Sequence, residues 1–281
     1  MNRLGILSVA ACFFAGSIFT GCNKDDDAPG NSSFTSINAK VENGPWDFDE
    51  VKAVMDVDEY IAGKSNYTGG GFNIQLSATV DEKYLYPIGD DMPEGITVSD
   101  KTAMIGSAYI EAYKSGAYKG DISYIKLPEM PDGSSTSFTL SAAQALIVYV
   151  DKNVTMKGTF KDPEDIDLIG LKDLFDDFKV TATANAGFKK GWNYMYVTNN
   201  FSIKINLVTG KTSANGTISL TTQNPGGMKW YFDGDDVLQQ FGVVAAKSFQ
   251  PETDTQLSQI AQISKEFQKA VFKFNPFLKS K

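Results

Sequence analysis

Apolar and polar residues alternate with a period of two along most of the chain. The clearest case is the segment 72–78, in which Phe72, Ile74 and Leu76 are separated by single polar residues. Such a period places the apolar side chains on one face of a β-strand. Similar segments, separated by glycine, proline and asparagine turns, cover residues 34–41, 46–57, 102–113, 118–127, 145–150, 154–160, 180–186, 192–197, 201–208, 217–221 and 228–232. This pattern predicts a mainly β protein with an antiparallel, sandwich or barrel-like body.

A helical period appears in a few segments. The residues Asp162–Pro163–Glu164 combine a capping side chain, a proline in the first turn and an early acidic residue, which predicts a helix near residues 163–178. An apolar stripe from Leu257 to Phe274 predicts a C-terminal amphipathic helix, and a shorter helix is predicted over residues 236–246. We expect the apolar faces of these helices to pack on the sheet.

The interior of the chain contains one linker-like stretch, the glycine and serine run at residues 133–137. The sequence is therefore compatible with one continuous β-rich body over residues 34–281. The alternative is two closely packed β units with a boundary near residues 133–141.

The first 21 residues have the features of a secretory signal peptide. Arg3 precedes an apolar run from Leu4 to Phe19, and this run is shorter than the ~20 residues that a membrane-spanning helix needs. The following residues, Phe19–Thr20–Gly21–Cys22, resemble the bacterial lipobox, in which small residues precede a cysteine that is lipidated and becomes the new N-terminus. Phe19 departs from the pattern because leucine is usual there. The resemblance implies a diacylglycerol anchor on Cys22.

Cysteine usage agrees with this interpretation. The only other cysteine, Cys12, lies within the predicted signal peptide. The processed chain would therefore keep Cys22 alone and could form no internal disulfide.

Residues 22–33 have no apolar periodicity and predict a flexible tether. Within them, Lys24, Asp25 and Asp26 resemble the surface-export signal that follows the lipidated cysteine in lipoproteins of Bacteroidota. The resemblance implies a protein held on the outer membrane and exposed at the cell surface. The alternative is that these residues form only a hydrophilic spacer.

The composition excludes several classes of function. The chain has no histidine, Arg3 is its only arginine, and its net charge is −8 at pH 7. Histidine-dependent nucleophilic catalysis and imidazole-ligated zinc or haem are therefore excluded, and an acidic chain is a poor partner for nucleic acid. The acidic runs 162–167 and 233–236 lack the spacing of an EF-hand loop. We predict no enzyme activity, no cofactor and no metal site.

The segment 192–200 is the candidate ligand site. In a strand, Trp192, Tyr194 and Tyr196 would face one way, and Met195 would face the other. Flat amphipathic rings suit the faces of sugars, and the amides of Asn199 and Asn200 at the predicted turn 198–200 would hydrogen-bond to sugar hydroxyls. The alternative is that the rings line the core.

These observations predict a lipid-anchored surface protein that captures a glycan or another nutrient, with an outer-membrane transporter as a further partner. A structural or adhesive surface lipoprotein that contacts other proteins is the first alternative, and a carboxylate-dependent hydrolase is the second. Exposure of Trp192, Tyr194 and Tyr196 would favour capture, whereas their burial would favour the structural or adhesive alternative.

Overall fold

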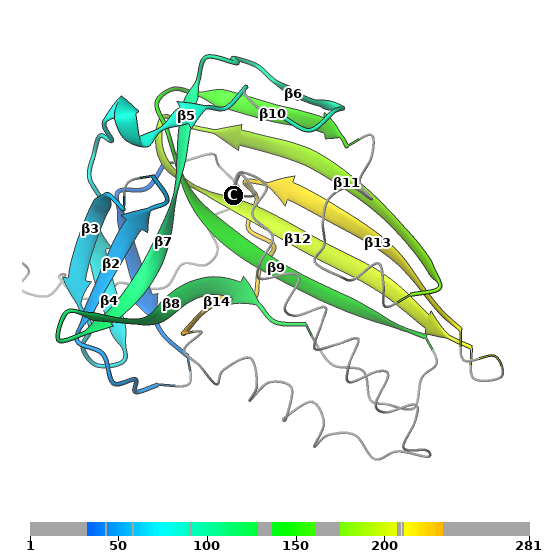
Figure 1. The fold of residues 1–281 in the computed structure, drawn as a ribbon, viewed down its shortest axis with the longest axis horizontal. Coiled ribbons are helices and arrows are strands. Elements are labelled where there is room, and N and C mark those ends of the chain that lie inside the picture. The colour runs from blue at the N-terminus through cyan, green and yellow to red at the C-terminus, as the bar shows by residue number, and fades with distance from the viewer. Residues whose placement is uncertain are drawn as a thin grey trace, which may run out of the picture. The chain divides into compact units, whose positions relative to one another are not determined.

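A computed structural model describes residues 33–42, 44–57, 59–89, 92–128, 137–160, 175–206, 209 and 211–232 (Figure 1). Within these residues the protein is mainly β, as the sequence predicts, with one short 3-10 helix, η1 (Glu82–Tyr84). The strands are β1 (Ser36–Lys40), β2 (Glu50–Met55), β3 (Ile61–Asn66), β4 (Gly71–Gln75), β5 (Tyr86–Pro87), β6 (Ile96–Val98), β7 (Met104–Lys114), β8 (Ala117–Lys126), β9 (Ser137–Val150), β10 (Val154–Thr159), β11 (Asp177–Phe188), β12 (Gly191–Ile205), β13 (Thr212–Thr221) and β14 (Lys229–Phe232).

Most of these strands belong to one large sheet. Its order is β3-β2-β7-β8-β9-β12-β13-β11-β10-β6, with β5 joined to β7 and β14 joined to β8. A separate antiparallel pair consists of β1 and β4. In the described part of the chain the pairings between these strands are antiparallel except between β11 and β13, and an isolated parallel bridge joins Val41 to Trp230. The consecutive strands β11 and β12 run in opposite directions. Because β13 lies between them and is antiparallel to β12, it is parallel to β11.

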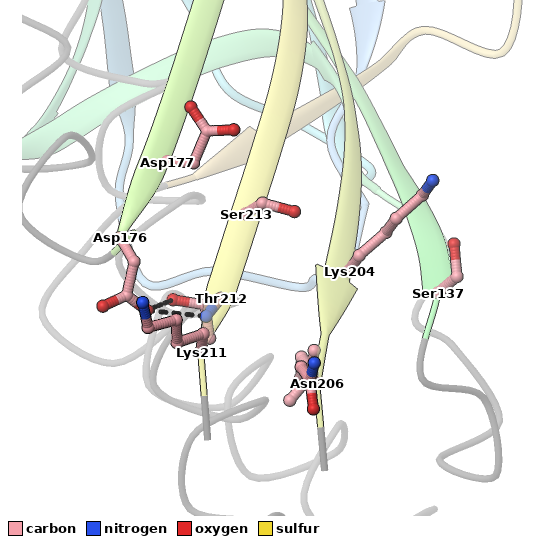
Figure 2. A pocket seen from close by; sticks show the side chains of 9 residues that line it. Ser137, Asp176, Asp177, Lys204, Asn206, Lys211, Thr212 and Ser213 are labelled. Carbon is pink, nitrogen blue, oxygen red and sulfur yellow. Dashed lines mark hydrogen bonds between the residues drawn. The ribbon is translucent and has the colours of Figure 1, made fainter. Parts of the chain in front are cut away.

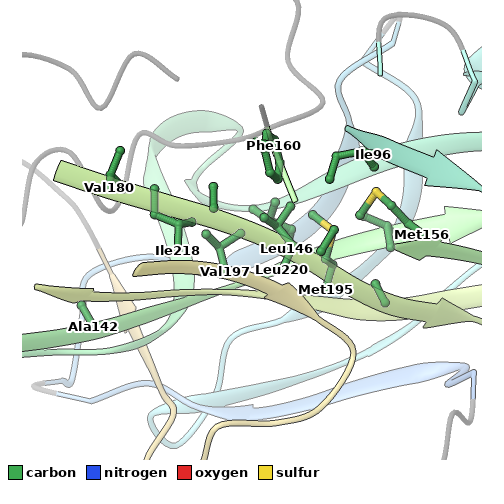
Figure 3. Packing of buried hydrophobic residues seen from close by; sticks show 14 of the residues in the cluster. Ile96, Ala142, Leu146, Met156, Phe160, Val180, Met195, Val197, Ile218 and Leu220 are labelled. Carbon is green, nitrogen blue, oxygen red and sulfur yellow. The ribbon is translucent and has the colours of Figure 1, made fainter. Parts of the chain in front are cut away.

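Apolar side chains cover both faces of the large sheet, which gives the body its sandwich-like packing. On one face, side chains from β9, β12 and β13 gather in a cluster that includes Leu146, Val197 and Ile218 (Figure 3). On the other face, Ile37 of β1 and Ile74 of β4 pack over side chains of the large sheet. Burial of each large apolar side chain contributes about 1.5–3 kcal/mol to folding.

The strand β12 corrects one prediction about the candidate site. Residues 198–200 were expected to form a turn between two strands, but they lie inside a single strand that pairs with β9 from Gly191 to Lys204. The apolar alternation continues through this segment, with Val197 and Phe201 on one face and Asn199 between them. The prediction of a turn is therefore wrong, because Asn199 faces inward within a strand.

The predicted helix near residues 163–178 lies mostly outside the described residues, but its expected end is wrong. Asp177 and Phe178 belong to β11, where Asp177 pairs with Ser213. Phe178 pairs with Ala214 of β13, and its ring stacks on Phe201 with centroids 5.9 Å apart.

Several other predictions concern residues that the structure does not describe. The helices predicted over residues 236–246 and 257–274 and the whole of residues 1–32 lie outside the described ranges. Of the proposed boundary region, residues 137–141 lie in β9, and strands from both sides of it join the same sheet. No helix within the described ranges is long and apolar enough to cross a membrane.

Candidate functional site

The aromatic row predicted as a ligand site belongs to the core. Trp192 is 2% exposed and Tyr196 is 5% exposed, and Tyr194 is partly buried between them. The expected division of faces is confirmed, because Met195 lies in the cluster on the opposite face of the sheet. The alternation was therefore predicted correctly, but both faces of this part of β12 are covered.

Trp192 has the contacts of a structural residue. Its indole Nε1 donates a hydrogen bond of 2.8 Å to the carbonyl oxygen of Ser77, and its ring meets Tyr149 edge to face at 5.3 Å. Its carbonyl oxygen accepts a bond of 3.0 Å from the backbone N–H of Phe34. These contacts occupy the ring and its polar atom, so no sugar could stack on it without unfolding this region.

The other two rings pack against aromatic neighbours. Tyr194 stacks on Phe34 with centroids 4.4 Å apart and lies 6.0 Å from Tyr196 and 5.7 Å from Tyr124. Burial raises the pKa of the Tyr194 phenol above its usual range. The row is thus an aromatic cluster between strands and offers no free ring face.

The two predicted amides face opposite ways. Asn199 is 1% exposed and lies among apolar residues, and within the described residues its Nδ2 has no hydrogen-bond partner. Asn200 lies on the other face of the sheet, where it pairs with Ser141 and Thr217 and is partly exposed. The structure therefore does not bring the two amides together beside the aromatic row.

The remaining predicted site residues, Cys22, Lys24, Asp25 and Asp26, lie outside the described residues, as do the acidic runs 162–167 and 233–236. Among the residues that the structure describes, no group of three or more acidic or cysteine side chains is arranged to hold a metal ion.

An exposed polar and aromatic surface lies on β3, β2, β7 and β8. Strand pairing places its side chains in two rows, because residues directly opposite each other on neighbouring strands share a face. One row consists of Asn66, Glu50, Tyr113 and Tyr118, and the next consists of Lys64, Lys52, Glu111 and Asp121. We call these eight residues the tyrosine–carboxylate face.

A tight turn positions the two tyrosines. The strands β7 and β8 are joined through Ser115 and Gly116, whose φ angles of 50° and 81° match the two-residue turns that suit the twist of a hairpin. The Asp49 carboxylate accepts hydrogen bonds of 3.0 and 3.2 Å from the Ser115 N–H and holds the turn in place. Tyr113 and Tyr118 then meet edge to face with centroids 6.0 Å apart.

Each ring has a polar neighbour that fixes its orientation. The Tyr113 phenol donates to Oε2 of Glu111, and the Lys52 ammonium lies 3.7 Å from the Tyr113 ring centroid. Partial burial, followed by the Glu111 contact, raises the pKa of Tyr113 to about 12. The phenol therefore stays protonated at neutral pH and remains a donor.

The lysines of the face are paired as well. Lys52 Nζ lies 3.3 Å from one carboxylate oxygen of Glu50, and Lys64 Nζ lies 3.4 Å from the other. Both lysines contact Glu50, so the two lysines face three carboxylates and the face carries one excess negative charge, which disfavours an anionic ligand.

Tyr118 is the more exposed of the two aromatic side chains of the face. It is 55% exposed, and its phenol donates 2.9 Å to Oδ1 of Asp121. The other large apolar side chain that is exposed in the described part of the chain, Ile61 at 45%, pairs with Val54 of β2, which in turn pairs with Tyr109 of β7. Both of these exposed side chains thus belong to strands that carry the face, β3 and β8.

A concave surface lies at the ends of β9, β11, β12 and β13. This open pocket has a volume of about 530 Å³ and is lined by Ser137, Asp176, Asp177, Lys204, Ile205, Asn206, Lys211, Thr212 and Ser213 (Figure 2). The Asp176 carboxylate accepts from the backbone N–H of Thr212 at 2.7 Å and from its hydroxyl at 3.3 Å. These bonds, led by the backbone one, hold the pKa of Asp176 below its usual range.

Sequence reasoning missed both surfaces. For the tyrosine–carboxylate face a signal existed, since the predicted strands 102–113 and 118–127 end and begin with tyrosines on either side of a short turn. A hairpin there would have placed Tyr113 beside Tyr118. The partners from β2 and β3 follow from long-range register and had no local signal.

Comparisons of the chain with protein-family models, with curated proteins and with solved structures find no match.

Proposed function

We propose that the protein is a lipid-anchored, cell-surface binding protein that captures a neutral glycan on the tyrosine–carboxylate face, without catalysis. The observation that carries the proposal is the exposed Tyr118 ring, held by Asp121 beside the ring of Tyr113.

The chemistry of the face matches that of a sugar. The C–H face of a sugar ring packs on an exposed aromatic ring, and Tyr118 offers such a ring. Sugar hydroxyls donate to carboxylates, and Glu111 and Asp121 lie opposite each other on β7 and β8 next to the rings. Each carboxylate oxygen accepts more than one hydrogen bond, so Glu111 keeps acceptor capacity beyond its contact with Tyr113.

The proposed location rests on the N-terminal residues. The lipobox-like segment ending at Cys22 supports a lipid anchor, and Lys24, Asp25 and Asp26 support export to the cell surface. A glycan held there would be available to a transporter in the outer membrane, which we propose as a partner. The net charge of −8 disfavours nucleic acid as a ligand.

A glycan-binding panel with the full-length chain in detergent tests the proposal. Loss of an aromatic contact removes about 0.5–1.5 kcal/mol, so we expect Tyr118→Ala to weaken binding about threefold to tenfold. Tyr118→Phe is the matched control, because it keeps the ring and loses only the hydrogen bond to Asp121. Binding that survives in Tyr118→Ala at wild-type strength would contradict the proposal.

The burial of Trp192 and Tyr196 favours the structural or adhesive alternative, because it removes the glycan site that the sequence predicted on β12. If the wild-type chain binds no glycan of the panel, that alternative takes precedence, and the tyrosine–carboxylate face becomes a candidate contact surface for another protein.

A further inference from the structure

We infer that the pocket at the ends of β9, β11, β12 and β13 is a second binding site, which takes the carboxylate group of an acidic sugar such as a uronic acid. Among the described residues, neither the tyrosine–carboxylate face nor the predicted site residues of β12 contribute to this pocket.

Strand register builds one wall of the pocket. Ser137 of β9 pairs with Lys204 of β12, which pairs with Ser213 of β13. Because directly paired residues share a face, the side chain of Lys204 lies between those of Ser137 and Ser213, as Figure 2 shows. Asp177 of β11 completes the row through its pairing with Ser213.

The carboxylates that line the pocket have partners, but not every lysine does. Asp176 is engaged by Thr212, and Asp177 lies 3.3 Å from the Lys179 ammonium. The Lys211 ammonium acts electrostatically on the Asp176 carboxylate, whereas the ammonium of Lys204 has no hydrogen-bond or ion-pair partner among the described residues. The unmet capacity of the pocket is therefore that of cationic donors, which a carboxylate satisfies.

The volume and the other lining residues of the pocket suit the sugar ring that carries the carboxylate. A volume of about 530 Å³ lies within the range of small-molecule sites, ~300–1,000 Å³. The hydroxyl of Ser213 and the oxygens of Asp176 and Asp177 offer donors and acceptors for ring hydroxyls. The chain has no arginine in its body for bidentate recognition of phosphate, and lysine acts as a point charge. Asp176 and Asp177 would repel a phosphate monoester, with its charge of about −2, more strongly than a sugar carboxylate with a single charge.

The test compares two probes on the full-length chain in detergent, by calorimetry. One probe is a glucose trisaccharide, and the other is the same trisaccharide with its non-reducing end oxidised to glucuronic acid. A contact between Lys204 and a carboxylate predicts about threefold tighter binding of the acidic probe at low salt, and this preference should decline as salt is added.

The variant Lys204→Gln/Lys211→Gln should lose the preference, whereas Lys157→Gln should keep it, since Lys157 is an exposed lysine of β10 outside the pocket. Tyr118→Ala should also keep the preference, which separates this site from the proposed glycan face. Equal affinity of the wild-type chain for the two probes would overturn the inference, as would an unchanged preference in the double variant.

Discussion

The phenol of Tyr118 donates a hydrogen bond of 2.9 Å to Oδ1 of Asp121, although the two residues are three positions apart in one strand. In a regular strand, residues with this spacing point to opposite faces. The register between β7 and β8 shifts at this point, so that Ala112 pairs with Gly120 and Tyr113 pairs with Tyr118. The extra residue in β8 turns Tyr118 to the side of Asp121, as a β-bulge does.

Gly120→Ala tests whether this bulge presents Tyr118. Gly120 has a φ of 145°, a region that L-residues rarely adopt, so we expect the substitution to destabilise the fold by about 1–3 kcal/mol and to weaken glycan binding. Denaturant unfolding and the glycan panel measure the two effects.

The matched control is Gly69→Ala. Gly69 also has a positive φ, of 62°, but an added Cβ meets no atom within 4 Å, and the turn lies before β4. It should lower stability by a similar amount, about 1–2 kcal/mol, and leave binding unchanged. If both variants bind like the wild type, the bulge has no role in presenting the ring.

Trp192→Ala should damage the fold rather than a ligand site. The side chain is buried and bonded to Ser77, and truncation of such a tryptophan typically costs about 3–5 kcal/mol. Thermal and denaturant unfolding check this value against Tyr118→Ala, an exposed substitution that should change stability by about 0.5 kcal/mol. A Trp192→Ala chain as stable as the wild type would show that the indole is not packed as described.

Asp56 should make stability depend on pH. Burial raises the pKa of Asp56 above its ordinary value of 3.8, although the Ser107 hydroxyl donates 2.9 Å to Oδ2 and opposes the shift. Its Oδ1 is buried and has no hydrogen-bond partner among the described residues.

Between the ordinary and the raised pKa of Asp56 the folded chain binds more protons than the unfolded chain, so this group lowers stability as pH rises through that window. Asp56→Asn should therefore raise the melting temperature at neutral pH, and the gain should shrink towards about pH 4. Melting curves of both chains across this range provide the measurement, and a gain that is independent of pH would contradict the assignment.

Cys22→Ala should abolish lipidation and release an unprocessed or soluble form, because the proposed anchor is a thioether on that sulfur. Metabolic labelling with an acyl analogue measures the modification.

In cells that carry the wild-type anchor, replacing Lys24, Asp25 and Asp26 with alanine should protect the body from added protease. Label retained by Cys22→Ala would contradict the anchor, and equal digestion in both strains would reduce the acidic run to a spacer.

The periodic part of the fold could be predicted from local sequence. The segments 102–113, 118–127 and 154–160 correspond closely to β7, β8 and β10, because alternation is imposed by one buried face. Where the predicted secondary structure was wrong, the residue type or spacing of a single residue favoured another element. Asn199 suggested a turn but fills an inward position of β12, and Phe178 fitted a helical stripe but stacks on Phe201 from β11.

The site could not be predicted in the same way. The sequence correctly placed Trp192, Tyr194 and Tyr196 on one face, but their burial depends on distant parts of the chain. Trp192 and Tyr194 pack in the cluster that includes β1 and β4, and Tyr196 packs with Met228. The tyrosine–carboxylate face depends on pairings such as Glu50 with Tyr113, more than 60 positions apart. Such register is set by the whole sheet and leaves no local pattern.

The most direct test of the account asks which tyrosine rings meet the glycan. The full-length chain, labelled with ¹³C in its tyrosine rings, is titrated by NMR with a neutral oligosaccharide that the panel selects, and signals are assigned with single Tyr→Phe variants. The account predicts that the ring signals of Tyr118 and Tyr113 shift with saturable dependence on ligand, while those of Tyr194 and Tyr196 stay in place. Shifts at Tyr194 and Tyr196 without shifts at Tyr118, or no shift at any ring, would contradict it.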